Sequence, residues 1–222
     1  MTPRILVINP NSTQAVTDAI DRALAPLRRA EGPEIRCATL AEGPPGIETA
    51  HHAADVAPPL CALIAREDNR SDAFVIACFS DPGLHAARET TAKPVLGIGE
   101  AGLTTALNLG ERVGVVAIRP ASVVRQGRMV RTLGLAERFA GSIALDMGVV
   151  DLADEARVTR RMAEVGRRLR DERGADVILL GCAGMADYRE GLQRELGIPV
   201  VDPTQAAVGL AITAVSVGYR PV

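Results

Sequence analysis

Short apolar runs recur along the chain, and stretches with helical spacing separate most of them. Most of these runs are apolar on both faces, which is typical of strands buried in a parallel sheet. Strands that alternate with helices predict an α/β fold of mostly parallel sheets flanked by helices. The predicted strands are Ile5–Ile8, Glu34–Leu40, Ala73–Cys78, Pro94–Ile98, Val113–Ile118, Ser142–Leu145, Val177–Leu180 and Pro199–Val201.

The helical stretches carry apolar residues three or four positions apart, which places those residues on one face. A helix is predicted over Thr13–Arg29, and the last one over Thr204–Val217. The clearest apolar faces are Val16, Ile20, Leu24 and Leu27 in the first helix and Val158, Met162, Val165 and Leu169 in a later one.

The second half of the chain repeats features of the first. Asp72 precedes Cys78 by six residues, and Asp176 precedes Cys182 by the same spacing. A Pro-Val pair follows the two cysteines after 16 and 17 residues. These two correspondences, together with a looser match upstream of each cysteine, occur in the same order and indicate two α/β lobes with the cysteines at equivalent places.

The repeat also suggests where the lobes divide. Arg4–Pro10 matches Arg112–Pro120 loosely, so each match opens a lobe. We predict two pseudo-symmetric lobes with the active site in the cleft between them, residues 1–98 forming lobe 1 and residues 99–202 lobe 2. The C-terminal helix, within residues 203–222, is expected to pack back on lobe 1.

Composition and charge narrow the classes of function. The net charge is −2 and the pI about 6.0, so no basic field is present to hold nucleic acid. No apolar run reaches the ~20 residues that a membrane-spanning helix needs, and a strand-like run begins too early to leave room for a signal peptide. We expect a cytoplasmic protein that binds a small-molecule substrate, with no nucleic acid and no membrane partner. We also expect a homo-oligomer.

Cys78 and Cys182 each follow a buried strand and precede a predicted helix. In parallel sheets this is the carboxyl edge, where ligands bind. Backbone N–H groups and a helix N-terminus near a thiol stabilise the thiolate. Two thiols that reach one substrate carbon from opposite sides suit a two-base inversion, with the sulfur atoms on the order of 6–9 Å apart. Cys37 and Cys61 lack matched positions and are interpreted as small buried apolar residues.

Three segments around these residues resemble the hydantoin racemases of the Asp/Glu/hydantoin racemase superfamily, and allantoin racemases are very similar. The segments are Val7–Ser12, Ile76–Leu84 and Leu180–Met185. The resemblance runs over nearly the whole chain. It implies two pseudo-symmetric lobes, no cofactor, and inversion of the carbon next to a carbonyl in a five-membered cyclic ureide.

The resemblance also implies roles for particular residues. Cys78 and Cys182 match the acid–base pair. The candidate substrate-binding residues are Asn9, Asn11, Ser12, Thr13, Phe79, Ser80, Asp81, Ala183, Gly184 and Met185. Ser80 departs from the glycine expected there and adds a hydroxyl, and the loop Gly43–Thr49 matches the family only roughly.

Other members of the superfamily remain as alternatives. Aspartate and glutamate racemases carry Cys-Asn-Thr and Cys-Thr-His at the two sites, whereas this chain has Cys78-Phe79-Ser80 and Cys182-Ala183-Gly184. The second site therefore lacks a hydroxyl and an imidazole, and a neutral ring fits it better than a zwitterion. Arylmalonate decarboxylases use a single cysteine, so two cysteines argue against that activity. An enzyme similar to maleate isomerase stays open.

Neither a metal site nor a nucleotide site is indicated. Adjacent His51 and His52 would point to different faces of a helix, and no acidic or cysteine partner has ligand spacing. His85 is interpreted as a surface or capping residue. The Gly-x-Gly at Gly97–Gly99 lacks the sequel of a dinucleotide site. A two-lobed small-molecule binding protein with merely buried thiols is the non-enzymatic alternative.

Overall fold

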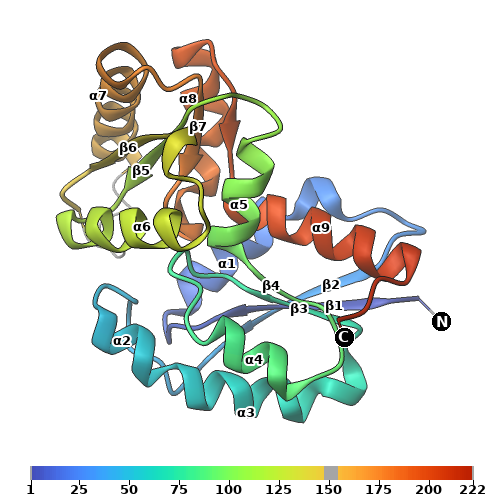
Figure 1. Cartoon of the computed structure of the whole chain (residues 1–222). Helices are drawn as coiled ribbons and strands as arrows, with labels where there is room; N and C mark the ends of the chain where they lie inside the picture. The colour runs from blue at the N-terminus through green and yellow to red at the C-terminus, as the bar shows by residue number, and fades with distance from the viewer. Residues whose placement is uncertain (1, 148–154, 222) are drawn as a thin grey trace. The chain divides into compact units, whose positions relative to one another are not determined.

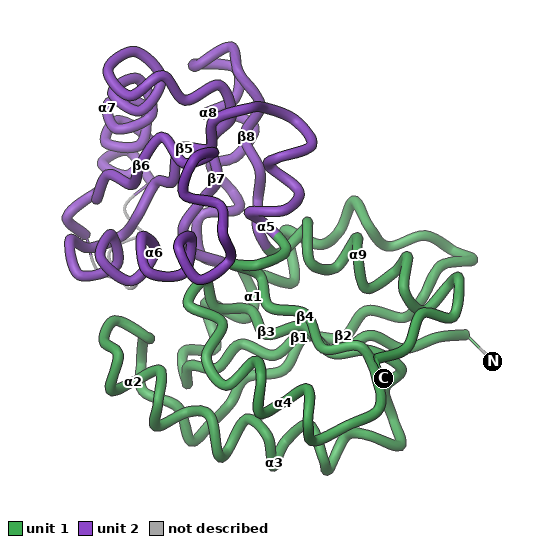
Figure 2. Tube along the Cα trace, viewed as in Figure 1, with its two compact units in different colours: residues 1–101, 204–222 green, residues 102–203 purple. Residues whose placement is uncertain are grey.

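The computed structural model describes residues 2–147 and 155–221, and the chain divides into two compact units. Unit 1 comprises residues 1–101 and 204–222, and unit 2 comprises residues 102–203 (Figure 2). The divisions fall inside helix α5 (Ile98–Ala106) and inside helix α9 (Pro203–Val217).

Unit 1 is built on a four-stranded parallel sheet with the order β2-β1-β3-β4. The strands are β1 (Arg4–Asn9), β2 (Glu34–Thr39), β3 (Ala73–Ile76) and β4 (Val95–Gly97). The chain goes from β1 to a neighbour on one side and then crosses to the other side for β3. Such a reversal of direction leaves a crevice at the carboxyl ends of β1 and β3, where ligands bind in open α/β sheets.

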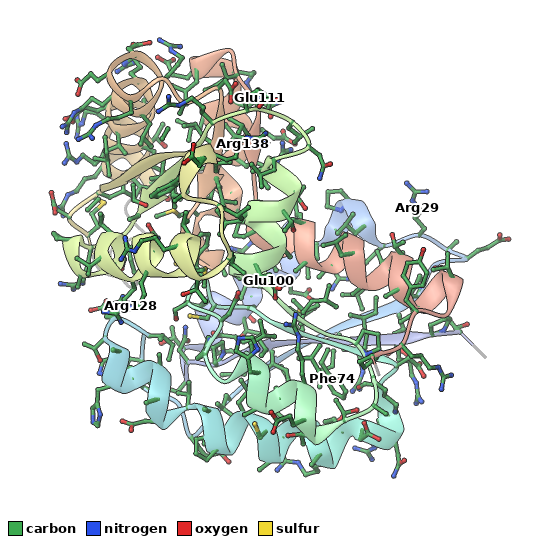
Figure 3. The ribbon with its side chains drawn as sticks, in the orientation of Figure 1. Arg29, Phe74, Glu100, Glu111, Arg128 and Arg138 are labelled. Atoms are coloured by element: carbon green, nitrogen blue, oxygen red, sulfur yellow. The ribbon has the colours of Figure 1, made fainter. Side chains whose placement is uncertain are left out.

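Helices cover both faces of this first sheet (Figure 1). Its helical segments are α1 (Gln14–Ala23), η1 (Ala25–Leu27), α2 (Ala50–Asp55), α3 (Ala57–Glu67), η2 (Asp68–Arg70) and α4 (Leu84–Thr90). Leu60 and Ile64 of α3 and Leu84 of α4 join Phe74 of β3 in one buried apolar cluster. In Figure 3, Phe74 lies between the sheet and α4. Burial of this cluster fixes α3 and α4 on one face of the sheet.

Unit 2 repeats the same sheet topology with the order β6-β5-β7-β8, all strands parallel. Its elements are β5 (Val113–Ala117), α6 (Pro120–Thr132), η3 (Ala136–Arg138), β6 (Phe139–Ala144), α7 (Glu155–Arg173), β7 (Val177–Leu180), η5 (Ala183–Tyr188), α8 (Arg189–Leu196) and β8 (Val200–Val201). The buried residues of α7 include Val158, Met162, Val165 and Leu169, the face that the sequence predicts.

The predicted fold class is confirmed, and all eight predicted strands are present. The sequence places the lobe boundaries at 98 and 202, whereas the units divide at 101 and 203. The helix predicted over Thr13–Arg29 is shorter, because α1 ends at Ala23 and Pro26 lies in the separate turn η1. Proline inside a helix loses a hydrogen bond and clashes with the preceding turn. Among the described helices, none is long and apolar enough to cross a membrane.

Candidate active site

Cys78 lies in the turn that follows β3, at the carboxyl edge of the first sheet. The Ala77 amide still donates to the carbonyl of Ile8 at 2.8 Å, and the chain leaves the sheet at the next residue. The Asp81 amide then donates to the Cys78 carbonyl at 2.9 Å, which closes a turn around the thiol. The Cys78 Sγ lies 3.3 Å from the Ser80 Oγ. The Ser80 hydroxyl, which departs from the glycine expected at this position, is therefore a hydrogen-bond partner of the Cys78 thiol.

A turn separates Cys78 from the helix that the sequence placed directly after it. Helix α4 begins only at Leu84, and its N-cap residue is Gly83, with φ of 66°. The N–H groups near Cys78 therefore belong to the turn rather than to α4.

Cys182 occupies the equivalent place in the second sheet. The Gly181 amide donates to the carbonyl of Val116 at 2.8 Å, and Cys182 then takes the N-cap position of η5 with extended dihedral angles of −158° and 139°. The amide of Met185 donates to the Cys182 carbonyl at 3.2 Å. The two cysteines are thus in equivalent places: Cys78 follows β3, which pairs with β1, and Cys182 follows β7, which pairs with β5.

Gly181 has no room for a side chain, which explains the small residue before the second cysteine. A Cβ there would lie 2.5 Å from the Val116 carbonyl oxygen and 2.7 Å from the Gln126 Nε2. Real Cβ atoms essentially never come this close to a backbone oxygen. Glycine lets the end of β7 pack directly against β5 and α6.

The predicted polar stretch after β1 folds into a turn held by its own side chains. The Asn9 Nδ2 donates to the Asn11 Oδ1 and the Thr17 Oγ1, both at 3.0 Å, and the Thr13 amide donates to the Asn11 Oδ1 at 2.9 Å. Asn9 is 1% exposed and Asn11 is 6% exposed. The Ser12 amide donates to the Pro44 carbonyl, so the loop after β2 lies against this turn.

Because β1 pairs with β3, this turn and the Cys78 turn follow neighbouring strands at one edge of the first sheet. The structure brings together the candidates of unit 1 and, separately, those of unit 2. Within both groups, some candidates are buried and others are partly exposed. Phe79, Ala183 and Met185 are buried, and Ser80, Gly184 and the two cysteines keep partial exposure.

Asp81 has an environment that the sequence did not reveal. Its Oδ1 accepts the Gly99 amide and its Oδ2 accepts the Glu100 amide, both at 2.8 Å. The residue keeps some exposed surface, but its carboxylate is enclosed by the chain around Gly97. This burial raises the pKa of Asp81 from 3.8 to about 7, although both amides and Arg88 favour the charged form.

A family model described as "Asp/Glu/Hydantoin racemase" matches residues 5–211. The chain belongs to this racemase family. A hydantoin racemase from a Pseudomonas species is 38% identical over 98% of this chain and 88% of that protein. A hydantoin racemase from Paenarthrobacter aurescens is 36% identical, covering 98% of this chain and 93% of that protein. The solved allantoin racemase from Klebsiella pneumoniae matches with a TM-score of 0.92 at 33% identity, over 100% of this chain and 91% of that one.

The other two cysteines of this family member lie away from the carboxyl edges. Burial, together with a hydrogen bond to Asp21, raises the pKa of Cys37 in β2 to about 12. A thiol in this state is a poor nucleophile and base at neutral pH. Cys61 of α3 packs against the apolar cluster of unit 1. All four cysteines lie within the described residues and are thiols rather than disulfides.

Two of the three histidines, His51 and His52, make local contacts. The His51 Nε2 lies 3.1 Å from Asp55, and the His52 Nδ1 accepts the Glu48 amide at 3.3 Å. His85 is exposed on α4. Over residues 2–147 and 155–221, no group of three or more histidine, cysteine, aspartate or glutamate residues is placed to hold a metal ion.

Sequence reasoning missed one segment at the edge of the second sheet. Residues 118–122 come directly after β5, the strand that pairs with β7. In the first sheet, the turn of Asn11 to Thr13 follows β1, the strand that pairs with β3, in the same way. The sequence did contain a signal for this segment. Aligning Pro120 with Pro10 in the loose match of Arg112–Pro120 to Arg4–Pro10 places Arg119 opposite Asn9, at the start of the polar turn of the first lobe. These residues join the candidates for contact with a substrate.

Proposed function

We propose that this protein is a cofactor-independent racemase that inverts the carbon next to a carbonyl in a 5-substituted hydantoin or a related cyclic ureide. The observation that carries the proposal is the matched position of Cys78 and Cys182, each after the equivalent strand of one of two sheets with the same topology. The similarity to hydantoin racemases over nearly the whole chain favours this ring system as the substrate.

The proposed mechanism uses one cysteine as a thiolate and the other as a thiol. The thiolate removes the proton from the ring carbon, and the electron pair of the C–H bond moves into the adjacent carbonyl to form an enolate. The thiol on the other face then delivers its proton to the same carbon, and the double bond returns to the carbonyl. The product has the opposite configuration and the two sulfurs have exchanged protonation states, so one racemisation in the reverse direction or exchange with water restores the enzyme.

This chemistry suits the groups around each thiol. The ring proton is acidified by the neighbouring carbonyl, so a thiolate is a sufficient base. Donors aimed at the developing enolate oxygen lower the barrier most when they are already in place. The backbone amides of the turns after β3 and β7 are the candidates for this role, while the Ser80 hydroxyl lies within hydrogen-bond distance of the Cys78 sulfur.

A second substrate is favoured by a specific observation. The allantoin racemase from Klebsiella pneumoniae matches this chain over its full length. Allantoin is a hydantoin with a ureido group on the ring carbon, so the same two thiols and the same enolate serve both substrates. What differs is the substituent pocket, and a panel of 5-substituted hydantoins and allantoin separates the two activities.

We further propose that the protein is a cytoplasmic homo-oligomer. Thiols that act as acid and base must stay reduced, and a reducing compartment keeps them so. Sedimentation equilibrium of the purified protein measures the number of subunits, and a monomer at micromolar concentration would contradict the oligomer.

Isotope exchange tests the two-thiol mechanism. In D₂O, we expect Cys78→Ser to exchange the ring proton of one enantiomer only, and Cys182→Ser to exchange only the other. Both variants should racemise far more slowly than the parent, because a hydroxyl is a much weaker acid–base group than a thiol near pH 7. Proton NMR of each pure enantiomer gives the four rates. Exchange of the same enantiomer by both variants would refute the mechanism.

Alkylation separates the enzyme from a binding protein with inert thiols. Iodoacetamide should modify Cys78 or Cys182 at neutral pH, and the substrate should protect them. If both thiols resist alkylation and no ureide or amino acid is racemised in polarimetry, the protein is a binding protein instead.

A further inference from the structure

Helix α5 begins without a capping side chain of its own. The residue before Ile98 is Gly97, which ends β4. Helix N-termini leave several backbone N–H groups unpaired, and a serine, threonine, aspartate or asparagine at the preceding position usually accepts from the second or third of them. Gly97 has no side chain to do so.

Asp81, from a different part of the chain, supplies this cap. Its two carboxylate oxygens accept the amides of Gly99 and Glu100, the second and third residues of α5. A Cβ on Gly97 would lie 2.5 Å and 2.6 Å from these same oxygens. The Asp81 carboxylate therefore occupies the space that a side chain at position 97 would fill.

The same residue closes the turn that carries Cys78. The Asp81 amide donates to the Cys78 carbonyl at 2.9 Å, and the amide of Leu84 donates to the Asp81 carbonyl at 3.2 Å. Asp81 has a φ of 45°, in the left-handed region that aspartate and asparagine enter more readily than most side chains. Its backbone sets the end of the turn while its side chain attaches that turn to α5.

An ion pair connects the elements on either side of this attachment. Arg88 of α4 contacts Glu100 at 2.7 Å and donates through its Nε to the Val95 carbonyl of β4 at 3.1 Å. Figure 3 shows Glu100 near the start of α5. Helix α4, strand β4 and helix α5 are thus held together around the point where Asp81 reaches α5.

We propose that Asp81 is a positioning residue for Cys78, and that its carboxylate anchors the Cys78 turn to the N-terminus of α5. This role is separate from the substrate contact expected from the family resemblance, because each carboxylate oxygen accepts a backbone amide of α5. The inference rests on the proposed function for its consequence in catalysis, whereas the anchoring itself does not depend on the substrate.

The chain offers a matched control for the anchoring carboxylate. Asp176 accepts the amides of Arg112 and Glu111 at 2.8 Å and 3.0 Å, so it also bridges two successive backbone N–H groups. It directly precedes β7, at the opposite end of that strand from Cys182. Asp176→Asn removes the same kind of hydrogen bond without touching a cysteine turn.

Two variants remove the anchor in different ways. Asp81→Asn keeps a residue that tolerates the left-handed backbone but loses one of the two acceptors. Gly97→Ala keeps Asp81 and places a methyl group where the carboxylate lies. The two variants and the control Asp176→Asn are each treated with iodoacetamide. Mass spectrometry then measures the alkylation rates of Cys78 and Cys182 in each protein. The kcat and KM for racemisation of a single-enantiomer hydantoin are measured alongside.

We expect Asp81→Asn and Gly97→Ala to speed alkylation of Cys78 at least about threefold, because a released turn exposes the thiol more often. The rate at Cys182 should stay within about twofold. The kcat should fall about 10- to 100-fold with little change in KM, since a misplaced base loses turnover before it loses binding. Faster alkylation with slower turnover distinguishes a misplaced thiol from a less reactive one. Asp176→Asn should leave both cysteines and kcat near the parental values.

Unchanged alkylation of Cys78 in both variants would overturn the proposal, as would equal changes at both cysteines that Asp176→Asn reproduces. If the parent protein racemises no hydantoin, the proposed function fails, and the alkylation rates still decide whether Asp81 anchors the turn.

Discussion

Replacing Asp81 with asparagine should change how the stability of the protein depends on pH. Burial raises the pKa of Asp81 to about 7, against an ordinary value of 3.8, and Glu100 adds to this rise while Arg88 and the amides of Gly99 and Glu100 oppose it. Between these two pH values the folded protein holds a proton that the unfolded chain has lost. Stability therefore falls as the pH rises through this window, because the native state binds more protons than the unfolded state.

The size of the effect follows from the shift. Between the two pKa values, each unit of pH changes the free energy of unfolding by about 1.4 kcal/mol. Above the folded-state pKa of about 7, both states have lost the proton and this dependence on pH ends. The contribution of Asp81 should decrease by about 2–3 kcal/mol between pH 5 and pH 8. The asparagine side chain of the variant does not titrate, so the loss of stability caused by Asp81→Asn should be largest at pH 5 and smaller by this amount at pH 8.

Urea unfolding at pH 5, 6, 7 and 8, followed by circular dichroism, measures the difference between parent and variant at each pH. Asp176→Asn again serves as the control. Burial tends to raise the pKa of Asp176, but hydrogen bonds from the amides of Arg112 and Glu111 hold it below its ordinary value. Its contribution is therefore fully present across this pH range and is lost only in more acidic solution. If the difference between parent and Asp81→Asn stays constant from pH 5 to pH 8, the carboxyl of Asp81 is ionised throughout and the reasoning is wrong.

Three further predictions concern the glycine before the second cysteine and two of the thiols. Gly181→Ala should lower stability by about 1–3 kcal/mol, because the new methyl group meets the Val116 carbonyl within a packed strand pair; an unchanged urea midpoint would contradict this. Ser80→Gly should slow the alkylation of Cys78 at pH 7 by roughly fivefold, the equivalent of one hydrogen bond of about 1 kcal/mol to the thiolate; an equal or faster rate would show that the hydroxyl does not stabilise it. Cys37 should resist iodoacetamide at pH 8 in the folded protein and react after unfolding, since its pKa is raised to about 12.

Much of the fold was predictable from the sequence because the signals are local. Val177–Leu180 and Ala73–Ile76 are apolar on both faces, and that pattern marks a buried parallel strand wherever the strand finally lies. The carboxyl ends of parallel strands share an edge, so a cysteine directly after such a strand is predictably at a ligand-binding edge. Pro26 was also a local signal, because a proline there indicates that the first helix ends before Arg29.

The partner of Asp81 was not predictable in this way. A carboxylate at a turn is compatible with contact to a substrate, a metal ion or a backbone amide, and residue type does not choose among them. The choice depends on β4 lying beside β3, which brings the start of α5 to the Cys78 turn. In the second half of the chain an aspartate, Asp202, directly precedes α9, so the internal repeat gave no sign that α5 takes its cap from elsewhere.

The sequence by itself determined the α/β class, the eight strands, the repeated lobes and the two cysteines at strand ends, because hydrophobic periodicity and spacing are properties of short segments. Only the tertiary structure decided the order of the strands, the hydrogen-bonded turn of Asn9 and Asn11, the fit of Gly181 against β5, and the attachment of Asp81 to α5. These features depend on which distant segments become neighbours. That is fixed by the packing of the whole unit and by the need to pair every buried polar group.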